Sequence, residues 1–285
     1  MAADDGLLIR WPDPLPDGER IVLRHGSSGD ERAANPAGDR RSCVLALGEL
    51  GPGAWEVHLE AGSLTRPLLT DDPGFSLDEL RAYAAFPRRR SVRVTRSREG
   101  RVMVRVHEVV PHAEVEVVHP RDDEIRVGGL LAYSGPRSGE ARLVALAREG
   151  GGTAVGAARI HGTEFHARLP LTSLAAVRPP VHWDLWLDVA DVHARLATLL
   201  DDAPGKQGKL AFPSQTVSSG GGELIVRPYY TARDELSVAC HRADSWWGDD
   251  PPHPPETATG PAPSTPLALR SGNRADTRWG DDPPH

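Results

Sequence analysis

Apolar and polar residues alternate over short stretches of the chain between Leu7 and Cys240, and Gly- and Pro-rich turns separate these stretches. In residues 55–60 the residues Trp, Val and Leu fall on one face and Glu, His and Glu on the other. Because successive side chains of a strand point to opposite faces, this pattern predicts a half-buried strand. The chain is therefore predicted to be built almost entirely from strands.

The same alternation predicts strands at 7–11, 20–25, 43–47, 91–95, 101–109, 113–118, 124–133, 141–147, 153–160, 164–169, 210–212, 223–228 and 235–240. Residues 26–41 are polar and predict a loop. A helical period occurs once, where Leu77, Leu80 and Tyr83 share a side, Ser76 precedes them and Pro87 ends the run. Short strands joined by Gly/Pro turns favour antiparallel sandwiches over a doubly wound sheet.

An internal repeat organises these strands. Residues 55–60 align with residues 183–188 at an offset of 128, and residues 101–104 align with residues 235–238 at an offset of 134. The prediction is an all-β protein with two tandem immunoglobulin-like antiparallel β-sandwiches, in residues 1–110 and 111–241. The Cys…Trp…Cys signature of true immunoglobulin domains is absent. Cys43 and Cys240 fall in different repeats, which predicts reduced thiols on strands.

Residues 242–285 are rich in Pro and Gly and carry too little apolar material to form a core, which predicts a disordered tail. A 12-residue segment at 242–253 recurs at 274–285. The recurrence is either a recent duplication in a drifting tail or two copies of a short linear motif.

The net charge of -7 is spread over both halves, so the charge balance implies no basic patch of the kind that follows a phosphate backbone. Nucleic acid is not an expected partner. The N-terminal residues lack the pattern of a signal peptide, and no apolar run is long enough to cross a bilayer. We therefore expect no transmembrane segment and a cytoplasmic location.

Motifs of the common catalytic classes are missing. The sequence contains no Asp-x-Asp, Gly-x-Ser-x-Gly, Walker-type or Gly-x-Gly-x-x-Gly motif. His107 and His112 are five residues apart with Pro111 between them, which does not suit a zinc-binding helix and favours a linker. The sequence therefore predicts no catalytic residue, metal ligand or cofactor.

Paired aspartates occur at the same place in both repeats, at 71–72 and 201–202. Adjacent carboxylates could bind a divalent metal. An Asp side chain ahead of Pro-Gly also stabilises a turn by bonding to the backbone. Because a duplicated corner of the fold recurs more readily than a tuned metal site, the turn is favoured.

Trp186 is replaced in the first repeat, where His58 stands in its place. Alternation puts Trp186 opposite Trp183, between Asp184 and Asp188, whereas Trp183 and Trp55 are expected core anchors. An exposed ring between carboxylates can stack on a sugar while the acids accept its hydroxyls. The alternative is that another strand, the other domain or a partner covers this ring. Tyr229 and Tyr230 allow the same two interpretations.

At residues 183–188, 201–206, 227–231 and 236–238 the chain resembles the β-sandwich accessory region that lies C-terminal to the catalytic domain in bacterial cell-wall polymer transferases. These are family 2 glycosyltransferases and glycerophosphotransferases of the teichoic-acid type. The resemblance covers residues 1–241, and the nucleotide-sugar-binding catalytic domain is not in this chain. In the family such modules are implicated in trimerisation, in spacing and in holding the polymer, so the resemblance implies a non-catalytic role and self-association.

Three functions follow as hypotheses. The first is an accessory or scaffolding module associated with cell-envelope glycan or teichoic-acid-like polymer transferases. The second is a carbohydrate-binding module that contacts a glycan polymer through Trp186, Asp184, Asp188, Tyr229 and Tyr230. The third is a transferase or hydrolase whose site is built from scattered residues without a recognisable motif.

Overall fold

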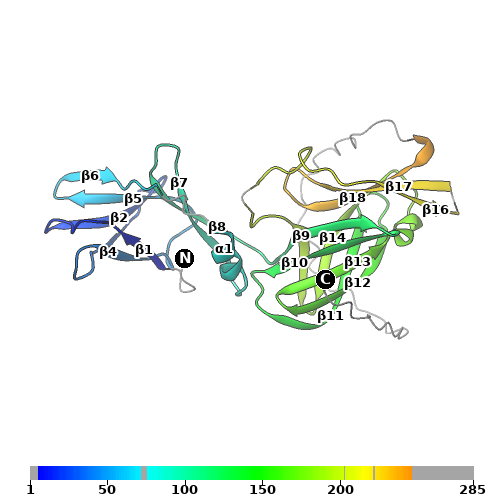
Figure 1. Cartoon of the computed structure of the whole chain (residues 1–285), viewed down its shortest axis with the longest axis horizontal. Coiled ribbons are helices and arrows are strands. Elements are labelled where there is room, and N and C mark those ends of the chain that lie inside the picture. The colour runs from blue at the N-terminus through cyan, green and yellow to red at the C-terminus, as the bar shows by residue number, and fades with distance from the viewer. Residues whose placement is uncertain (1–5, 72–75, 202, 221, 246–285) are drawn as a thin grey trace, which may run out of the picture. The chain divides into compact units, whose positions relative to one another are not determined.

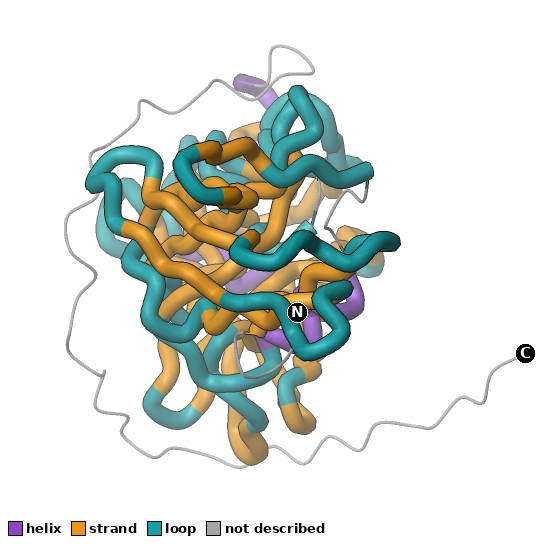
Figure 2. Tube along the Cα trace, turned by 90° about the vertical axis from the view of Figure 1, so that its left-hand side faces the viewer, coloured by secondary structure: helices purple, strands orange, loops and turns teal. Residues whose placement is uncertain are grey.

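The computed structural model describes residues 6–71, 76–201, 203–220 and 222–245 (Figure 1). Strands and loops make up almost all of the described chain (Figure 2). The chain is therefore mostly β, as the alternation predicts. The predicted disordered tail and its repeat lie outside the described residues, apart from 242–245.

The first half of the chain forms two sheets over one core. One sheet has two strands, and the other has the order β3-β2-β5-β8-β7 with β6 beside β5. Side chains from both sheets meet in a single cluster that contains Trp55, which is a core anchor as predicted. The strands are β1 (Gly6–Arg10), β2 (Glu19–His25), β3 (Glu31–Ala34), β4 (Ser42–Ala46), β5 (Gly53–Ala61), β6 (Leu64–Pro67), β7 (Arg90–Arg96) and β8 (Val102–Glu108).

The single α-helix of the described residues, α1 (Leu77–Ala84), is the predicted one. Its N-cap is Ser76, whose hydroxyl oxygen accepts a hydrogen bond from the Glu79 backbone N–H at 3.3 Å. This bond satisfies one of the amides that a helix start leaves open. Leu80 and Tyr83 form its buried face and pack in a small cluster with Tyr133.

The second half of the chain differs from the predicted sandwich. Seven strands follow the order β11-β12-β13-β10-β9-β15-β14, and β14 pairs again with β11, so this sheet closes into a barrel. Strands β18, β17 and β16 extend from β14. The strands are β9 (His112–Arg121), β10 (Glu124–Ala132), β11 (Arg137–Ala147), β12 (Thr153–Gly162), β13 (Glu164–Pro170), β14 (Val181–Val189), β15 (Val192–Ala197), β16 (Gln215–Ser219), β17 (Gly222–Tyr230) and β18 (Leu236–Arg242), with short 3-10 helices at Leu171–Ala176 and Ala243–Ser245.

The strand registers confirm the internal repeat. Trp55 pairs with Val104, and Trp183 pairs with Val238. Further along the same edge of β5, His58 pairs with Pro67 of β6. At the equivalent place on β14, Trp186 pairs with Arg195 of β15. These partners are related by the offsets of 134 and 128 seen in the sequence alignment. Chain order and pairing then match β1 with β10, β2 with β11, β3 with β12, β4 with β13, β5 with β14, β6 with β15, β7 with β17 and β8 with β18.

Two differences between the repeats close the barrel. Strands β12 and β13 pair with each other, whereas their short counterparts β3 and β4 do not. Strand β9, which has no counterpart among the described residues of the first repeat, pairs antiparallel with β10 and parallel with β15. Gly129 sits at the bulge between β9 and β10, where a Cβ atom would lie 1.9 Å from the Glu114 carbonyl oxygen. Glycine is therefore required for this closure.

Several predicted elements differ in detail. The polar segment 26–41, predicted as a loop, contains β3. Residues 210–212, predicted as a strand, are a loop, and the edge strand β16 begins after them at Gln215. Cys43 on β4 and Cys240 on β18 are buried free thiols, as predicted. No helix of the described residues is long and apolar enough to cross a membrane.

Candidate functional site

Strand β14 carries the predicted site on one of its two faces. Trp183, Leu185 and Leu187 point into the barrel core, and Trp183 is fully buried, which confirms it as a core anchor. Alternation puts Asp184, Trp186 and Asp188 on the opposite face. The face that the sequence assigned to Trp186 is therefore the outer face of the barrel.

The sheet forks at Leu185. One edge of β14 pairs with β11, while the other pairs first with β18 as far as Asp184 and then with β15 from Trp186. The guanidinium of Arg195 lies at the fork, where its Nη1 donates to the carbonyl oxygens of Leu185 and Leu236 at 2.7 and 3.0 Å. Arg195 thus satisfies backbone acceptors where the ladder divides.

Asp184 is the acceptor of a polar network around this fork. Its Oδ1 accepts hydrogen bonds from Arg148 at 2.6 Å, from Arg195 at 2.8 Å and from the Ser237 hydroxyl at 3.2 Å. Burial opposes ionisation of this carboxyl, but the bond from Arg148 and the two positive charges win, and the pKa of Asp184 is lowered. Asp184 therefore stabilises the fork as a carboxylate, a role that the sequence did not suggest.

Trp186, His193 and Asp188 form what we call the Trp186 platform. The Trp186 and His193 rings stack at a centroid distance of 4.2 Å with an interplanar angle of 8°. His193 Nδ1 pairs with the Asp188 carboxylate, and the side chains of His193 and Asp188 are solvent-accessible. Arg195 Cζ lies 5.6 Å from the Trp186 ring centroid. The platform is a flat, half-buried aromatic surface next to a carboxylate.

The two predicted tyrosines lie on opposite faces of β17. Tyr229 is on the outer face, nearly buried, with its ring edge-to-face against His182 at 6.0 Å. Burial raises the pKa of Tyr229, and the charge of Arg148 opposes this rise. Tyr230 belongs to the barrel core and packs against Phe212, and burial raises its pKa as well. The structure thus brings Asp184 and Tyr229 together and separates Tyr230 from the Trp186 platform.

The sequence reasoning missed a buried polar pair on β9. His112 Nε2 lies 3.0 Å from Glu114 Oε2, and both side chains are buried. The Glu114 carboxylate also accepts hydrogen bonds from the backbone N–H groups of Leu199 and Leu200 at 2.7 and 3.0 Å. His112 and Glu114 on one strand were visible in the sequence, but the amides that bind Glu114 are 85 and 86 residues away.

Of the paired aspartates, Asp201 acts as the turn interpretation predicts, whereas the contact of Asp71 is an ion pair with Arg96 at 4.0 Å. Asp201 Oδ1 accepts a hydrogen bond from the Ala203 N–H at 3.3 Å, and Asp201 pairs with Lys206 Nζ at 2.6 Å. Gly205 has the positive φ of 74° that such a turn needs. Asp72 and Asp202 lie outside the described residues. Within the described part of the chain no group of three or more His, Cys, Asp or Glu residues is arranged to hold a metal ion.

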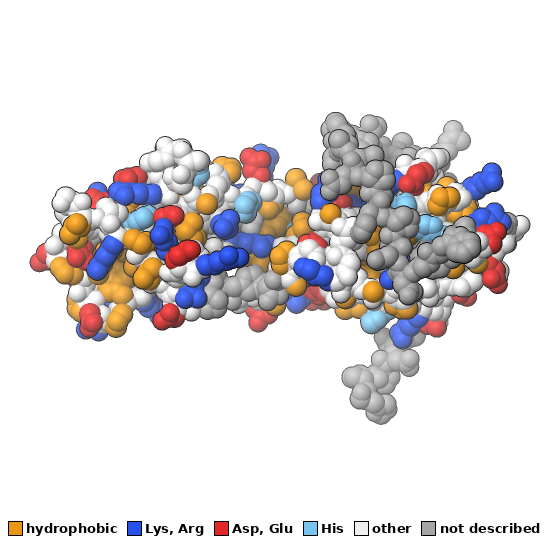
Figure 3. Space-filling view, turned by 90° about the horizontal axis from the view of Figure 1, so that it is seen from above, with side chains coloured by type: hydrophobic (Ala, Val, Ile, Leu, Met, Phe, Trp, Pro, Cys, Tyr) orange, Lys and Arg blue, Asp and Glu red, His pale blue; other side chains and the backbone are white. Residues whose placement is uncertain are grey.

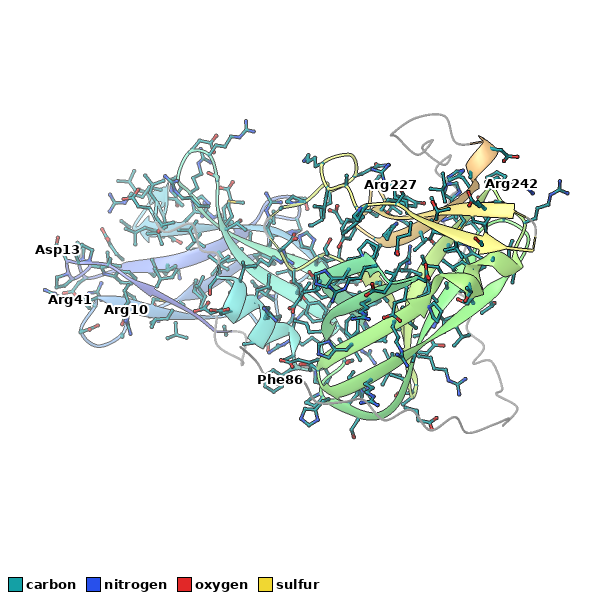
Figure 4. All side chains as sticks on the ribbon, turned by 45° about the vertical axis from the view of Figure 1, so that its right-hand side comes forward. Arg10, Asp13, Arg41, Phe86, Arg227 and Arg242 are labelled. Carbon is teal, nitrogen blue, oxygen red and sulfur yellow. The ribbon has the colours of Figure 1, made fainter. Side chains whose placement is uncertain are left out.

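Charged side chains of both signs are interspersed over the face seen in Figure 3. Arg227 on β17 and Arg242 at the end of β18 lie along the extension of the barrel sheet (Figure 4). Arg242 pairs with Asp244 at 3.6 Å.

These features define a mostly β protein made of two copies of one strand plan, with an ion-paired fork and an aromatic platform on the second copy. The sequence matches no protein-family model, and no curated protein matches it. Among solved structures, residues 217–571 of S. aureus TarS match with a TM-score of 0.38 and 15% identity over 52% of this chain and 44% of that one. A further structure of S. aureus TarS matches with a TM-score of 0.38 and 15% identity over 53% of this chain and 28% of the other. The chain thus spans less than half the length of either.

Proposed function

We propose that this protein is a non-catalytic accessory module that associates with a cell-envelope polymer transferase. The proposal rests on the sequence resemblance of residues 183–188 and 227–231 to the accessory region of such enzymes. The observation that supports a non-catalytic role is that the carboxylates of Asp184 and Glu114 hold strands and loops of the fold together. A general acid or base must reach a proton of the substrate. Asp184 Oδ1 instead accepts hydrogen bonds from Arg148, Arg195 and Ser237. Glu114 is buried, and its carboxylate accepts hydrogen bonds from the backbone N–H groups of Leu199 and Leu200.

The association is tested by expressing the full chain with an affinity tag in its source cell and identifying the proteins that copurify. We expect enrichment of a glycosyltransferase or glycerophosphotransferase of the envelope over a cell that expresses the tag alone. If no envelope polymer transferase is enriched, the association is refuted. Turnover of nucleotide sugars by the purified chain, above the rate in buffer, would refute the non-catalytic part.

Glycan binding is a second candidate, and the Trp186 platform is the observation that favours it. A flat indole that stacks on His193 can present apolar surface to a sugar ring, and the Asp188 carboxylate can accept hydroxyl hydrogens. The platform belongs to the second repeat alone, because His58 and Thr65 occupy the corresponding register positions in the first. A duplicated fold with one altered surface is consistent with a binding role added to a structural element.

The test is cosedimentation of the purified chain with isolated wall polymer. Trp186→Ala is expected to weaken retention by about threefold to tenfold, the loss that follows from removing one aromatic contact. The matched control is Phe86→Ala, which removes an exposed aromatic ring elsewhere on the surface (Figure 4). Equal retention of the two variants would rule out the platform as the contact. Self-association, which the family resemblance implies, is a separate prediction for analytical ultracentrifugation.

A further inference from the structure

Strand β9 fills a position in the second repeat whose counterpart in the first repeat can be located. β9 lies between β10 and β15, and the matching strands of the first repeat are β1 and β6. Among the residues that the structure describes, β1 pairs only with β4 and β6 pairs only with β5. The outer edges of β1 and β6 therefore have no strand partner in the described chain.

The backbone at Leu69 is directed toward this edge. Leu69 forms an isolated antiparallel bridge with Arg101, just before β8. Two hydrogen bonds flank this bridge, from Thr70 N to Gly100 O and from Val102 N to Leu68 O, each at 2.9 Å. In an antiparallel bridge of this kind the N–H and C=O of the central residue point away from the partner strand. Leu69 therefore presents its own backbone donor and acceptor to the outer edge.

Ala197 is the counterpart of Leu69 and shows what such an edge binds. It forms the same isolated bridge, to Glu235, and the hydrogen bond from Thr198 N to Asp234 O repeats that from Thr70 to Gly100. On its other side Ala197 pairs with Glu114 of β9. The same backbone arrangement is thus occupied by a strand in the second repeat.

Side-chain exposure agrees with this comparison. Ala197, which β9 covers, is 2% exposed, whereas Leu69 is 64% exposed. Leu64 on β6 is also a large exposed apolar residue. An unpaired edge with exposed leucines is a template for an added strand.

Strand β1 also points backbone groups to its outer edge. Trp11 N donates to Arg41 O at 3.1 Å, so Trp11 and Arg41 are a hydrogen-bonded pair at the end of the ladder between β1 and β4. Because bonded and non-bonded pairs alternate along an antiparallel ladder, the N–H and C=O groups of Leu8 and Arg10 point to the outer edge. β1 and Leu69 thus both offer the hydrogen bonds that β10 and Ala197 give to β9.

We propose that this position of the first repeat binds an extended segment of another protein by strand addition, antiparallel to β1 and parallel to residues 67–69. β9 indicates the chemistry of that segment, since its Ala113 and Val115 face the core and alternate with Glu114 and Glu116. Exposed Arg10 and Arg66 flank the position and complement acidic residues. The partner segment is therefore a strand of small apolar residues alternating with carboxylates.

This proposal holds whether or not the partner protein is a transferase. Its probe is a synthetic peptide with the sequence of residues 112–118, added to the full chain and followed by calorimetry and by hydrogen–deuterium exchange. We expect saturable binding and slower exchange at the amides of Leu8, Arg10 and Leu69, with β10 unchanged because β9 already covers it.

Leu69→Pro removes the outward N–H, and Leu69→Ala is the matched control that keeps it. We expect the proline variant to bind the peptide about fivefold or more weakly than the alanine variant, as the loss of one hydrogen bond implies. A peptide with N-methyl groups on alternate amides is expected not to bind.

Three results would overturn the proposal. In the free chain, amides of Leu8 and Leu69 that exchange as slowly as those of β10 would show that the edge is already paired. Equal binding of the peptide by Leu69→Pro and Leu69→Ala would exclude strand addition at this edge. Protection that rises with protein concentration, without peptide, would assign the edge to a second copy of this chain instead of another protein.

Discussion

Arg195 provides the sharpest test of how the fork in the barrel sheet is stabilised. Its guanidinium donates hydrogen bonds to the backbone carbonyls of Leu185 and Leu236. It also donates to the side chains of Asp184 and Ser237. Replacing it with Met keeps an unbranched apolar stem and removes all of these donors. The side chain of Arg195 is 11% exposed, so water does not replace them fully.

The magnitude follows from these contacts. Breaking a buried ion pair costs about 3–5 kcal/mol, and a buried carbonyl left without a donor costs about 1–3 kcal/mol. Asp184 is 30% exposed and keeps Arg148, which reduces the electrostatic part. We therefore expect Arg195→Met to lower the free energy of unfolding by about 3 kcal/mol.

The measurement is urea denaturation of the full chain followed by circular dichroism, where a loss of this size shifts the midpoint by roughly 1–2 M. The control is Arg20→Met, which breaks the pair between Arg20 and Glu60 at 3.1 Å, with Arg20 47% exposed. That variant is expected to lose less than about 1 kcal/mol. If Arg195→Met loses no more than Arg20→Met, then Arg195 does not stabilise the fork and the reasoning fails.

Three further predictions concern acid stability, thiol reactivity and close packing. Asp184 has a folded pKa below its ordinary value of 3.8, so its contribution is complete above that pH and is lost as pH falls through the folded pKa. In acid titrations of stability, the wild-type chain should therefore lose stability more steeply than Asp184→Asn, and parallel curves would contradict this. Burial raises the pKa of Cys43, and it raises that of Cys240 to about 12, so a thiol reagent at about pH 8 should label both only after denaturation. Rapid labelling of the folded chain would show that these thiols are accessible. Gly129→Ala should cost about 2 kcal/mol or more in urea denaturation because of the contact with the Glu114 carbonyl, whereas Gly38→Ala, which meets nothing within 4 Å, should change stability by less than about 0.5 kcal/mol. Equal effects of the two glycine substitutions would refute the packing argument.

The sequence by itself determined the strands whose two faces differ. In β5 and β14 the apolar residues face a core and the polar residues face out, and a one-residue slip would bury charges, so alternation specified both strands. It also determined α1, because the change of period and the Ser76 cap are local signals. The repeat was visible for the same reason, since equivalent strands carry equivalent alternation. Strand β3 was missed because its four residues are exposed or only partly buried and show no apolar face.

Only the tertiary structure decided how these strands are joined. Closure of the second repeat depends on β9 and on pairing between β12 and β13, and alternation within a strand does not say which strand lies beside it. The role of Asp184 was hidden for a related reason. Its partners Arg148 and Ser237 are 36 and 53 residues away, so an acidic residue beside Trp186 looked like part of a ligand site. Folding made it the centre of an ion-paired junction, because burying a carboxylate requires donors that only distant strands supply.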